Sequence, residues 1–190
     1  TGAPMVHNGK YYSVEARLYD PPAAPIPILT AANGKKSMRL AGEHGDGLIT
    51  DPKTWQKFRG EWEAGAHDAG KDTAVMPVVA ETFVVVGDES DARESAELWR
   101  FIPKAFESYF GIADPAEIQR RAEAEVPLEK LIAEWSVGTN PNQHIDAIRK
   151  LFDSGIKSVN IHVGQTDQHR AIEFLGTKVL PALREEMKVR

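Results

Sequence analysis

A short segment of small and basic residues could bind an anion. Its members are Thr30, Ala31, Ala32, Asn33, Gly34, Lys35 and Lys36, which join an expected strand to an expected helix. Small side chains let a ligand approach the backbone, and the free N–H groups at the start of a helix attract negative charge. The same residues suit a plain tight turn with an exposed lysine pair, so the residue types alone leave both interpretations open.

Three polar side chains stand within apolar runs that we expect to form strands. Asn160 and His162 alternate with apolar neighbours near the end of one run, and ligands gather at the carboxyl ends of parallel strands. His162 fits either a ligand pocket or a hydrogen-bonded place in the core. Glu81 lies within another run, where an unpaired carboxylate is costly, so it has a partner, lies at the solvent or ligand end, or is functional. We take Glu81, Asn160 and His162 as the candidate substrate-pocket residues.

Composition disfavours several other kinds of site and partner. The chain has no cysteine and its six histidines are scattered, so we expect no metal site. It contains no Walker loop, no dinucleotide-binding glycine motif, no nucleophile elbow and no His-Glu-x-x-His motif. A net charge of -5 disfavours nucleic acid and anionic membranes as partners, and the apolar runs are too short to cross a bilayer. We therefore expect a cytoplasmic protein with a small-molecule substrate.

Expected strands and helices alternate along most of the chain. Residues 1–25 predict a hairpin at Asn8-Gly9 and an extended linker, and residues 26–190 predict the β/α units of a single domain, 1–190. The expected strands cover 26–31, 48–50, 75–86 and 156–163. The expected helices cover 35–43, 51–70, 90–109, 129–135, 140–155 and 167–186, with another beginning at 114 and an interruption at Pro181. In the first helix we expect Met38, Leu40 and Ala41 to face inward.

The alternation predicts a parallel sheet, because parallel strands need crossover helices. Right-handed crossovers give an open doubly wound sheet or a barrel, and the periodicity does not choose between them. A complete (β/α)8 barrel takes about 250 residues, and only four core strands are expected in these 190 residues. If the fold is a barrel, half of it is missing, and the first residue, Thr1, suggests a processed chain or part of a longer one.

Several segments together resemble a known family. The segments are residues 27–34, 41–50, 98–101, 114–115, 138–141, 162, 167–168 and 179–184, preceded by the Asn8–Tyr12 stretch that resembles a hairpin before the family's fifth strand. As a set they resemble the luciferase-like deazaflavin-dependent oxidoreductases, in the sugar-6-phosphate dehydrogenase group that uses coenzyme F420. The match spans nearly the whole chain and is specific as a set, although no single segment is specific.

The resemblance implies a (β/α)8 barrel of the TIM type, an α/β fold of which this chain supplies only the fifth to eighth strands. It implies that backbone around Ala31, Ala32, Asn33 and Gly34 cradles the phosphate of coenzyme F420. It also implies an oxidoreductase of a family that is often homodimeric. The family's catalytic histidine lies in the first four strands, so no catalytic residue is assigned here and we expect little activity from this half alone.

Two departures from the family pattern bear on the substrate. Members that act on sugar phosphates use cationic residues just before the Asp-Pro pair, where this chain has Ser108, Tyr109 and Phe110, and before the tryptophan numbered Trp135, where it has Glu134. A carboxylate repels a phosphate monoester, so the sequence favours a neutral alcohol or carbonyl substrate. Two alternatives stay open: an FMN-dependent luciferase-like monooxygenase, and a non-catalytic α/β domain that binds a ligand or a partner.

Overall fold

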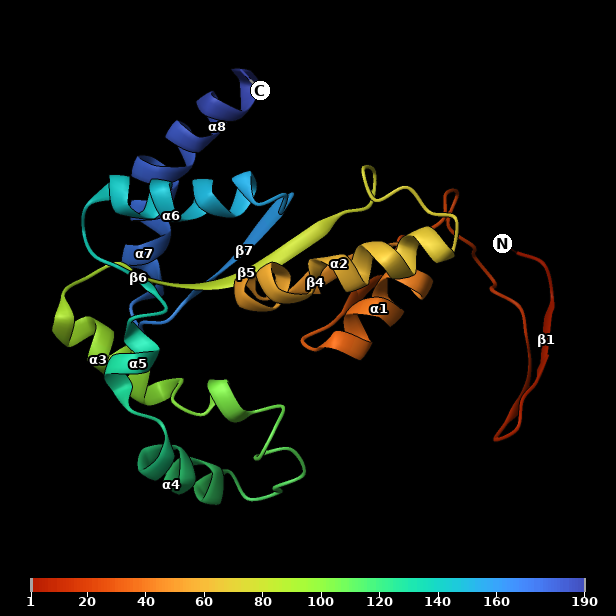
Figure 1. Cartoon of the computed structure of the whole chain (residues 1–190), viewed down its shortest axis with the longest axis horizontal. Helices are drawn as coiled ribbons and strands as arrows, with labels where there is room; N and C mark the ends of the chain where they lie inside the picture. Colours follow the sequence, from red (N-terminus) through yellow and green to blue (C-terminus); the bar gives the residue numbers. More distant parts are fainter. Residues whose placement is uncertain (1, 190) are drawn as a thin grey trace.

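Parallel strands form the main sheet of the protein, and a separate hairpin precedes it (Figure 1). A computed structural model describes residues 2–189, with side chains up to Glu186, so the outermost positions of the expected domain, 1 and 190, lie outside the described residues. The hairpin consists of β1 (Met5–Asn8) and β2 (Ser13–Ala16). The sheet contains β3 (Leu29–Ala31), β4 (Gly47–Thr50), β5 (Val78–Val85), β6 (Ser136–Val137) and β7 (Ser158–Val163).

The order of the strands is that of consecutive β/α units. β3, β4 and β5 are neighbours in that order, and β5 also pairs with β7 from Val79 to Val84. The short strand β6 pairs with Val84 and Val85 at the carboxyl end of β5, whereas β4 pairs with Val78 to Ala80. β6 therefore lies beyond the carboxyl end of β4, on the same side of β5. Every pair in this sheet is parallel, and the prediction of a parallel α/β sheet is confirmed.

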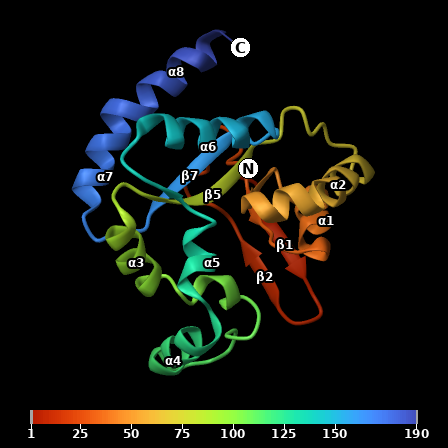
Figure 2. The same ribbon diagram turned by 60° about the vertical axis from the view of Figure 1, so that its left-hand side comes forward.

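Helices connect the strands and cover one face of the sheet (Figure 2). They are α1 (Lys35–His44), α2 (Pro52–Asp68), α3 (Glu89–Leu98), α4 (Pro115–Glu125), α5 (Leu128–Ile132), α6 (Pro141–Asp153), α7 (Gln168–Phe174) and α8 (Leu180–Val189), with a 3-10 turn at Ile102–Lys104 and a π-helical segment at Leu175–Val179. The group α3, α4 and α5 lies between β5 and β6 in the chain and away from α1 and α2 in both views.

Two apolar clusters fix the helices to the sheet and thereby define its two faces. One joins α1 and α2 to β4 and the first part of β5, and the other joins α6, α7 and α8 to β7 and the last part of β5. Ala80 and Val84 belong to these clusters, as do the alternate residues of β7. Because neighbouring residues of a strand point to opposite faces, the uncovered face carries the side chains of Glu81, Phe83, Asn160 and His162.

Several expected boundaries are corrected by the structure. The strand expected over 26–31 begins only at Leu29, since Pro27 has no N–H to donate to a ladder. The helix expected over 90–109 ends at Leu98 and is capped by Asp88, whose carboxylate accepts the N–H groups of Ser90 and Asp91.

Three further expectations change because of tertiary packing. Leu40 is 51% exposed, because α1 turns Met38, Ala41 and Gly42 toward α2 instead. Pro181 does not interrupt the last helix. The π-helical segment before it, in which the Leu180 N–H bonds to the Leu175 carbonyl, accommodates the N–H group that proline lacks. The two-residue strand β6 was not expected from the sequence, because it is too short to give a periodic pattern.

An ion pair connects the first turns of α3 and α7, the helices that follow β5 and β7, at the carboxyl edge of the sheet. Arg170 donates to the Val86 carbonyl and to Asp91 Oδ2 at 2.8 Å. The Arg170 hydrogen bond is the main cause that lowers the pKa of the Asp91 carboxyl, and the Asp88 N–H adds to it. A lowered pKa in the folded state means that the pair stabilises the fold above the ordinary aspartate pKa of about 3.9 and that this stability is lost as the pH falls through the folded value.

We therefore expect Asp91→Asn to lower the free energy of unfolding at pH 7 and to have a smaller effect at pH 2.5. Urea denaturation of both proteins at the two pH values measures the difference. In an Arg170→Gln background the loss caused by Asp91→Asn should shrink, whereas the effect of Asp46→Asn, whose carboxylate accepts the Ile28 N–H, should stay the same. An equal loss from Asp91→Asn at both pH values would contradict the assigned role of the pair.

Candidate functional site

The loop between β3 and α1 presents backbone donors at the carboxyl edge of the sheet. Its position is fixed by the Ala32 N–H, which donates to the Ile49 carbonyl at 3.0 Å, and by Thr50 Oγ1, which donates to the Ala32 carbonyl at 2.7 Å. Ala32 is 5% exposed, so it anchors the loop, whereas Ala31 and Asn33 are exposed. The loop is thus held by β4 while its outer residues face solvent.

The start of α1 fits an anionic group. The first intrahelical bond runs from the Met38 N–H to the Gly34 carbonyl, so the N–H groups of Lys35 and Lys36 have no acceptor within the helix. Ser37 Oγ accepts the Gly34 N–H at 3.1 Å, and no side chain caps the helix from the Gly34 position. Free donors and small neighbours together suit a phosphate, and Lys36 adds positive charge, whereas the Lys35 ammonium is paired with Glu61 Oε1 at 3.2 Å.

Glycine is not required at Gly34 by the backbone. Its φ is -155°, which is extended backbone that any residue adopts, and an added Cβ would lie 3.9 Å from Ser37 Oγ. A side chain of another kind can therefore be placed at this position without backbone strain or a close contact.

The three candidate substrate-pocket residues lie together on the uncovered face. Glu81 of β5 is the register partner of Asn160 of β7, and His162 follows two residues later on the same face. The Nε2 atom of His162 lies 3.6 Å from Glu81 Oε1, and both side chains are a little under half exposed. The structure thus brings Glu81 together with residues 79 and 81 positions further along the sequence, with Glu81 and Asn160 near the middle of their strands and His162 near the carboxyl end of β7.

Beside this polar group lies a cluster of rings that the sequence did not predict, here called the aromatic wall and defined as Phe83, Trp99 and Trp135. Phe83 stacks on Trp135 with a centroid distance of 5.0 Å and meets Trp99 edge-on at 5.3 Å. Phe83 also stacks on the His162 ring at 5.2 Å. The wall and the polar group therefore share one surface, where the His162 ring contacts Phe83 of the wall.

Hydrogen bonds from neighbouring segments hold the wall in place. Trp99 Nε1 donates to the Gly164 carbonyl at 3.0 Å, which ties the end of α3 to the end of β7. The segment after Trp135 is fixed by His144, which is fully buried and bonds Ser136 Oγ at 2.8 Å and the Gly138 carbonyl at 2.9 Å. Because a carbonyl only accepts, Nε2 of His144 carries its proton and Nδ1 accepts the Ser136 hydroxyl proton.

Charges near the wall are paired. Glu134, the residue before Trp135, forms an ion pair with Lys53 in the first turn of α2. This pair bridges the gap between the end of β4 and the start of β6. The place where the family resemblance implied a cation therefore holds a carboxylate whose charge is compensated by a lysine.

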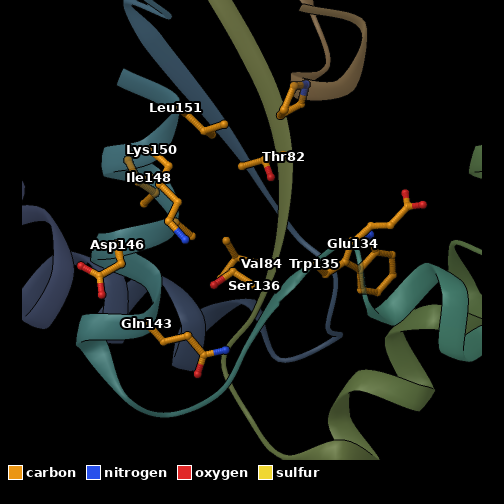
Figure 3. A pocket seen from close by; sticks show the side chains of 12 residues that line it. Thr82, Val84, Glu134, Trp135, Ser136, Gln143, Asp146, Ile148, Lys150 and Leu151 are labelled. Carbon is orange, nitrogen blue, oxygen red and sulfur yellow. The ribbon is translucent and has the colours of Figure 1, made fainter. Parts of the chain in front are cut away.

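A groove of about 540 Å³ opens on the other side of the same gap (Figure 3). Thr82 and Val84 form its floor, and Ile148 and Leu151 of α6 form one wall, while Glu134 and Trp135 lie at its edge. Its floor faces the helices, so it is separate from the surface that carries Glu81 and His162. We place the candidate site on the uncovered face, because polar groups and rings converge there, with Phe83 and His162 toward the carboxyl ends of β5 and β7.

The position of each predicted site residue can be stated from this geometry. Glu81, Asn160 and His162 form one group, whereas Ala31 to Gly34 lie at the end of β3, two strands away from β5. The sequence missed the wall because Trp99 was assigned to the interior of a long helix and Phe83 to an undivided apolar strand. The alternation of Glu81 and Phe83 with Ala80 and Thr82 was the available signal.

The described residues include neither a helix able to cross a membrane nor a cluster of metal ligands. No helix in residues 2–189 is both long and apolar enough to cross a membrane. Within the same residues, no three His, Asp or Glu side chains are grouped so that they could hold a metal ion.

Comparison with known proteins gives a consistent set of relatives. The family model described as luciferase-like monooxygenase matches residues 1–158. An F420-dependent hydroxymycolic acid dehydrogenase of Mycobacterium tuberculosis is 41% identical over 97% of this chain and 50% of its own length. An F420-dependent glucose-6-phosphate dehydrogenase of Nakamurella multipartita is 31% identical over 97% of this chain and 56% of its own.

A solved structure agrees with these sequence relatives. An F420-dependent secondary alcohol dehydrogenase, solved in complex with an F420-acetone adduct, superposes with a TM-score of 0.84 at 26% identity and covers 96% of this chain and 57% of that one. The chain thus spans about half the length of the curated relatives it matches. The family resemblance and the barrel-type α/β fold expected from the sequence are confirmed, and the chain belongs to the luciferase-like monooxygenase family.

Proposed function

We propose that this chain is part of a coenzyme F420-dependent oxidoreductase that transfers a hydride between the coenzyme and a small alcohol or carbonyl substrate. One observation carries the proposal: the similarity to F420-dependent dehydrogenases extends over 97% of the chain and reaches 41% identity. The superposition on an F420-dependent secondary alcohol dehydrogenase supports it. FMN is the alternative cofactor, since the family name describes monooxygenases.

The role of this chain toward the coenzyme is to bind its anionic tail. The residues proposed to do so are Ala31, Ala32, Asn33 and Gly34, whose loop ends in the uncapped N–H groups of α1. The deazaflavin ring, when bound, supplies the carbon that accepts or donates the hydride. Glu81, Asn160 and His162 are proposed to line the substrate pocket, because they share the uncovered face of β5 and β7.

The ion pair between Lys53 and Glu134 favours a substrate without a phosphate. Lys53 is already neutralised, and a second carboxylate, Glu81, lies on the uncovered face of the neighbouring strand. Among the relatives, one is named for glucose 6-phosphate and another for hydroxymycolic acid. The paired charges favour an alcohol without a phosphate group over a sugar phosphate. We also expect a homodimer, which light scattering of the purified protein would test.

A charge placed at Gly34 provides the test of coenzyme binding. Gly34→Asp should cap α1 and leave the stability equal or slightly higher, because aspartate is a better N-cap than glycine. The same carboxylate should weaken F420 binding at least tenfold, since it occupies the free N–H groups and repels the coenzyme phosphate. Titration of the wild-type and the Gly34→Asp protein with F420, followed by coenzyme fluorescence, measures the two affinities.

Gly34→Asn is the matched control, because it offers a similar cap without the charge and should weaken binding less than Gly34→Asp. Absence of F420 binding by the wild-type protein would remove the proposed coenzyme, and a flavin extracted from the purified protein would select the FMN alternative. Equal binding by Gly34→Asp and wild type would remove the proposed location of the tail.

A further inference from the structure

The groove on the helix-covered side of β5 is a second place where this chain could hold a ligand (Figure 3). It has a volume of about 540 Å³ and is bounded by the start of α2, by β5, by β6 and by α6. We call it the outer groove. A closed barrel adds strands at the free edges of β3 and β7, on the other side of these elements. The outer groove is therefore formed by this chain alone.

Most polar side chains of the outer groove already have partners. Its two carboxylates, Glu134 and Asp146, form ion pairs with a lysine of α2 and an arginine of α6. The Ser136 hydroxyl bonds to a buried histidine, and the Gln143 amide donates to a backbone carbonyl. These four side chains are held by the protein itself and do not need a ligand.

Two donors in the outer groove remain without a partner. Among the described residues, none bonds to the Thr82 hydroxyl and no carboxylate pairs with the Lys150 ammonium. Figure 3 shows the Lys150 side chain extending from α6 toward the middle of the groove, whereas the Asp146 carboxylate points away from it. One cation and one hydroxyl group are thus available to an anionic acceptor.

Apolar surface lies beside these two donors. Pro52, Ala147 and Leu151 line the groove and are partly exposed, and the buried side chains of Val84 and Ile148 support them from below. A ligand that uses the whole groove therefore needs an anionic end and an apolar body.

We propose that the outer groove binds a monocarboxylate with a linear apolar chain, a ligand with the chemistry of a short fatty acid. Its carboxylate accepts from Lys150 and Thr82, and its chain packs on Leu151, Ala147 and Pro52. One unpaired cation suits a single negative charge, and the two carboxylates at the edge of the groove oppose a dianion such as a phosphate monoester. This inference is independent of the proposed function, because it involves neither the coenzyme nor the uncovered face.

Isothermal titration calorimetry of the full chain with octanoate, acetate and octylammonium measures the selectivity. A fully buried methylene raises affinity roughly fourfold, so octanoate, with six more methylenes than acetate, should bind about tenfold more tightly or better even if most of them stay partly in water. Octylammonium has the same chain and the opposite charge, and it should bind about tenfold more weakly than octanoate. Added salt should weaken octanoate binding, because Lys150 is exposed.

Variants assign the binding to the outer groove. Lys150→Met should weaken octanoate about tenfold and remove the preference over octylammonium, and Thr82→Val should weaken it about threefold. Lys130→Met is the matched control, because Lys130 is also exposed but lies on α5 outside the groove, and it should leave the affinity unchanged. Ala147→Phe places a ring in the groove and should abolish binding, with circular dichroism as the check that the variant is folded.

Each outcome supports or overturns the outer groove as a carboxylate site. Absence of octanoate binding, equal binding of octanoate and octylammonium, or equal losses in Lys150→Met and Lys130→Met would overturn it. Wild-type affinity in a folded Ala147→Phe protein would show that octanoate binds elsewhere, and if that variant does not fold, the two lysine variants decide. Failure of F420 to bind in the separate titration would overturn the proposed function and would leave this result as it stands.

Discussion

Replacement of Gly42 by alanine should lower the free energy of unfolding by about 3 kcal/mol, the upper range for overpacking a core. Gly42 lies where α1 and α2 pack, and a Cβ there would be 2.1 Å from the Trp62 carbonyl oxygen and 2.8 Å from the Ala66 nitrogen. Both neighbours are backbone atoms of α2, so no side-chain rotation relieves the contact. The helices must separate, and the buried cluster around Met38 loses part of its packing.

Gly60→Ala is the matched control for this prediction. Gly60 also lies in α2, but an added Cβ there would meet nothing within 4 Å. The same substitution should therefore raise stability by about 0.5–1 kcal/mol through helix propensity. Urea denaturation followed by circular dichroism compares the two, and the prediction is wrong if Gly42→Ala is as stable as Gly60→Ala.

Gly42→Ala should also alter the position of the proposed coenzyme loop. α1 begins directly after Gly34, so a displacement of the helix moves the N–H groups that we propose to bind the coenzyme tail. At a temperature where Gly42→Ala is still folded, we expect weaker F420 binding than in Gly60→Ala. Stability and coenzyme binding are thus linked through one helix contact.

The parts of the fold that the sequence predicted correctly are those set by local patterns. The apolar stripe with Trp55, Trp62 and Ala66 predicted α2, and Asp51-Pro52 predicted its start, where Asp51 accepts the N–H groups of Lys53 and Thr54. The strand expected over 75–86 is observed at Val78–Val85, and it was predicted from continuous apolar residues, which are typical of a strand in a parallel sheet. Each of these signals lies within one element and depends little on the rest of the chain.

The parts that the sequence did not predict depend on contacts between distant segments. Trp99 becomes part of a wall only because its indole bonds Gly164, and Trp135 because β6 pairs with β5 for two residues. His144 looked like one of several scattered histidines, yet it is fully buried and holds the segment after Trp135. No pattern of period 2 or 3.6 contains this information.

The family resemblance supplied what periodicity could not. Alternating strands and helices allowed either an open sheet or a barrel, and the choice came from the set of matching segments. Alternation alone predicted that Asn160 and His162 share one face of their strand. Glu81 lies on the same face because it is the register partner of Asn160. Trp99 and Trp135 were outside the reach of that argument, because they lie in the insertion between β5 and β7.

The second large effect concerns the substrate, and it is a gain of binding. Glu134→Arg should bind inorganic phosphate and glucose 6-phosphate about 30-fold more tightly than the wild type. The substitution releases Lys53 from its ion pair and adds a second cation across the gap between β4 and β6. A charge-assisted hydrogen bond contributes about 1.5–3 kcal/mol, which corresponds to roughly 10–100-fold in affinity.

Glu134→Arg should lower the free energy of unfolding only slightly. The Glu134 and Lys53 side chains are 43% and 69% exposed, and an exposed ion pair of this kind contributes about 0–1 kcal/mol. Isothermal titration calorimetry with each phosphate measures the gain. Its dependence on salt should be steep, because the added attraction is between charges that solvent can screen.

Glu129→Arg separates a local effect from a change of net charge. It alters the charge of the chain by the same amount, and Glu129 lies on α5, where its partner is Arg93 instead of Lys53. A local phosphate site requires that Glu134→Arg gains binding, that Glu129→Arg does not, and that Lys53→Met added to Glu134→Arg removes part of the gain. Equal gains in Glu134→Arg and Glu129→Arg would show that the ion pair does not govern the choice between phosphate and neutral substrates.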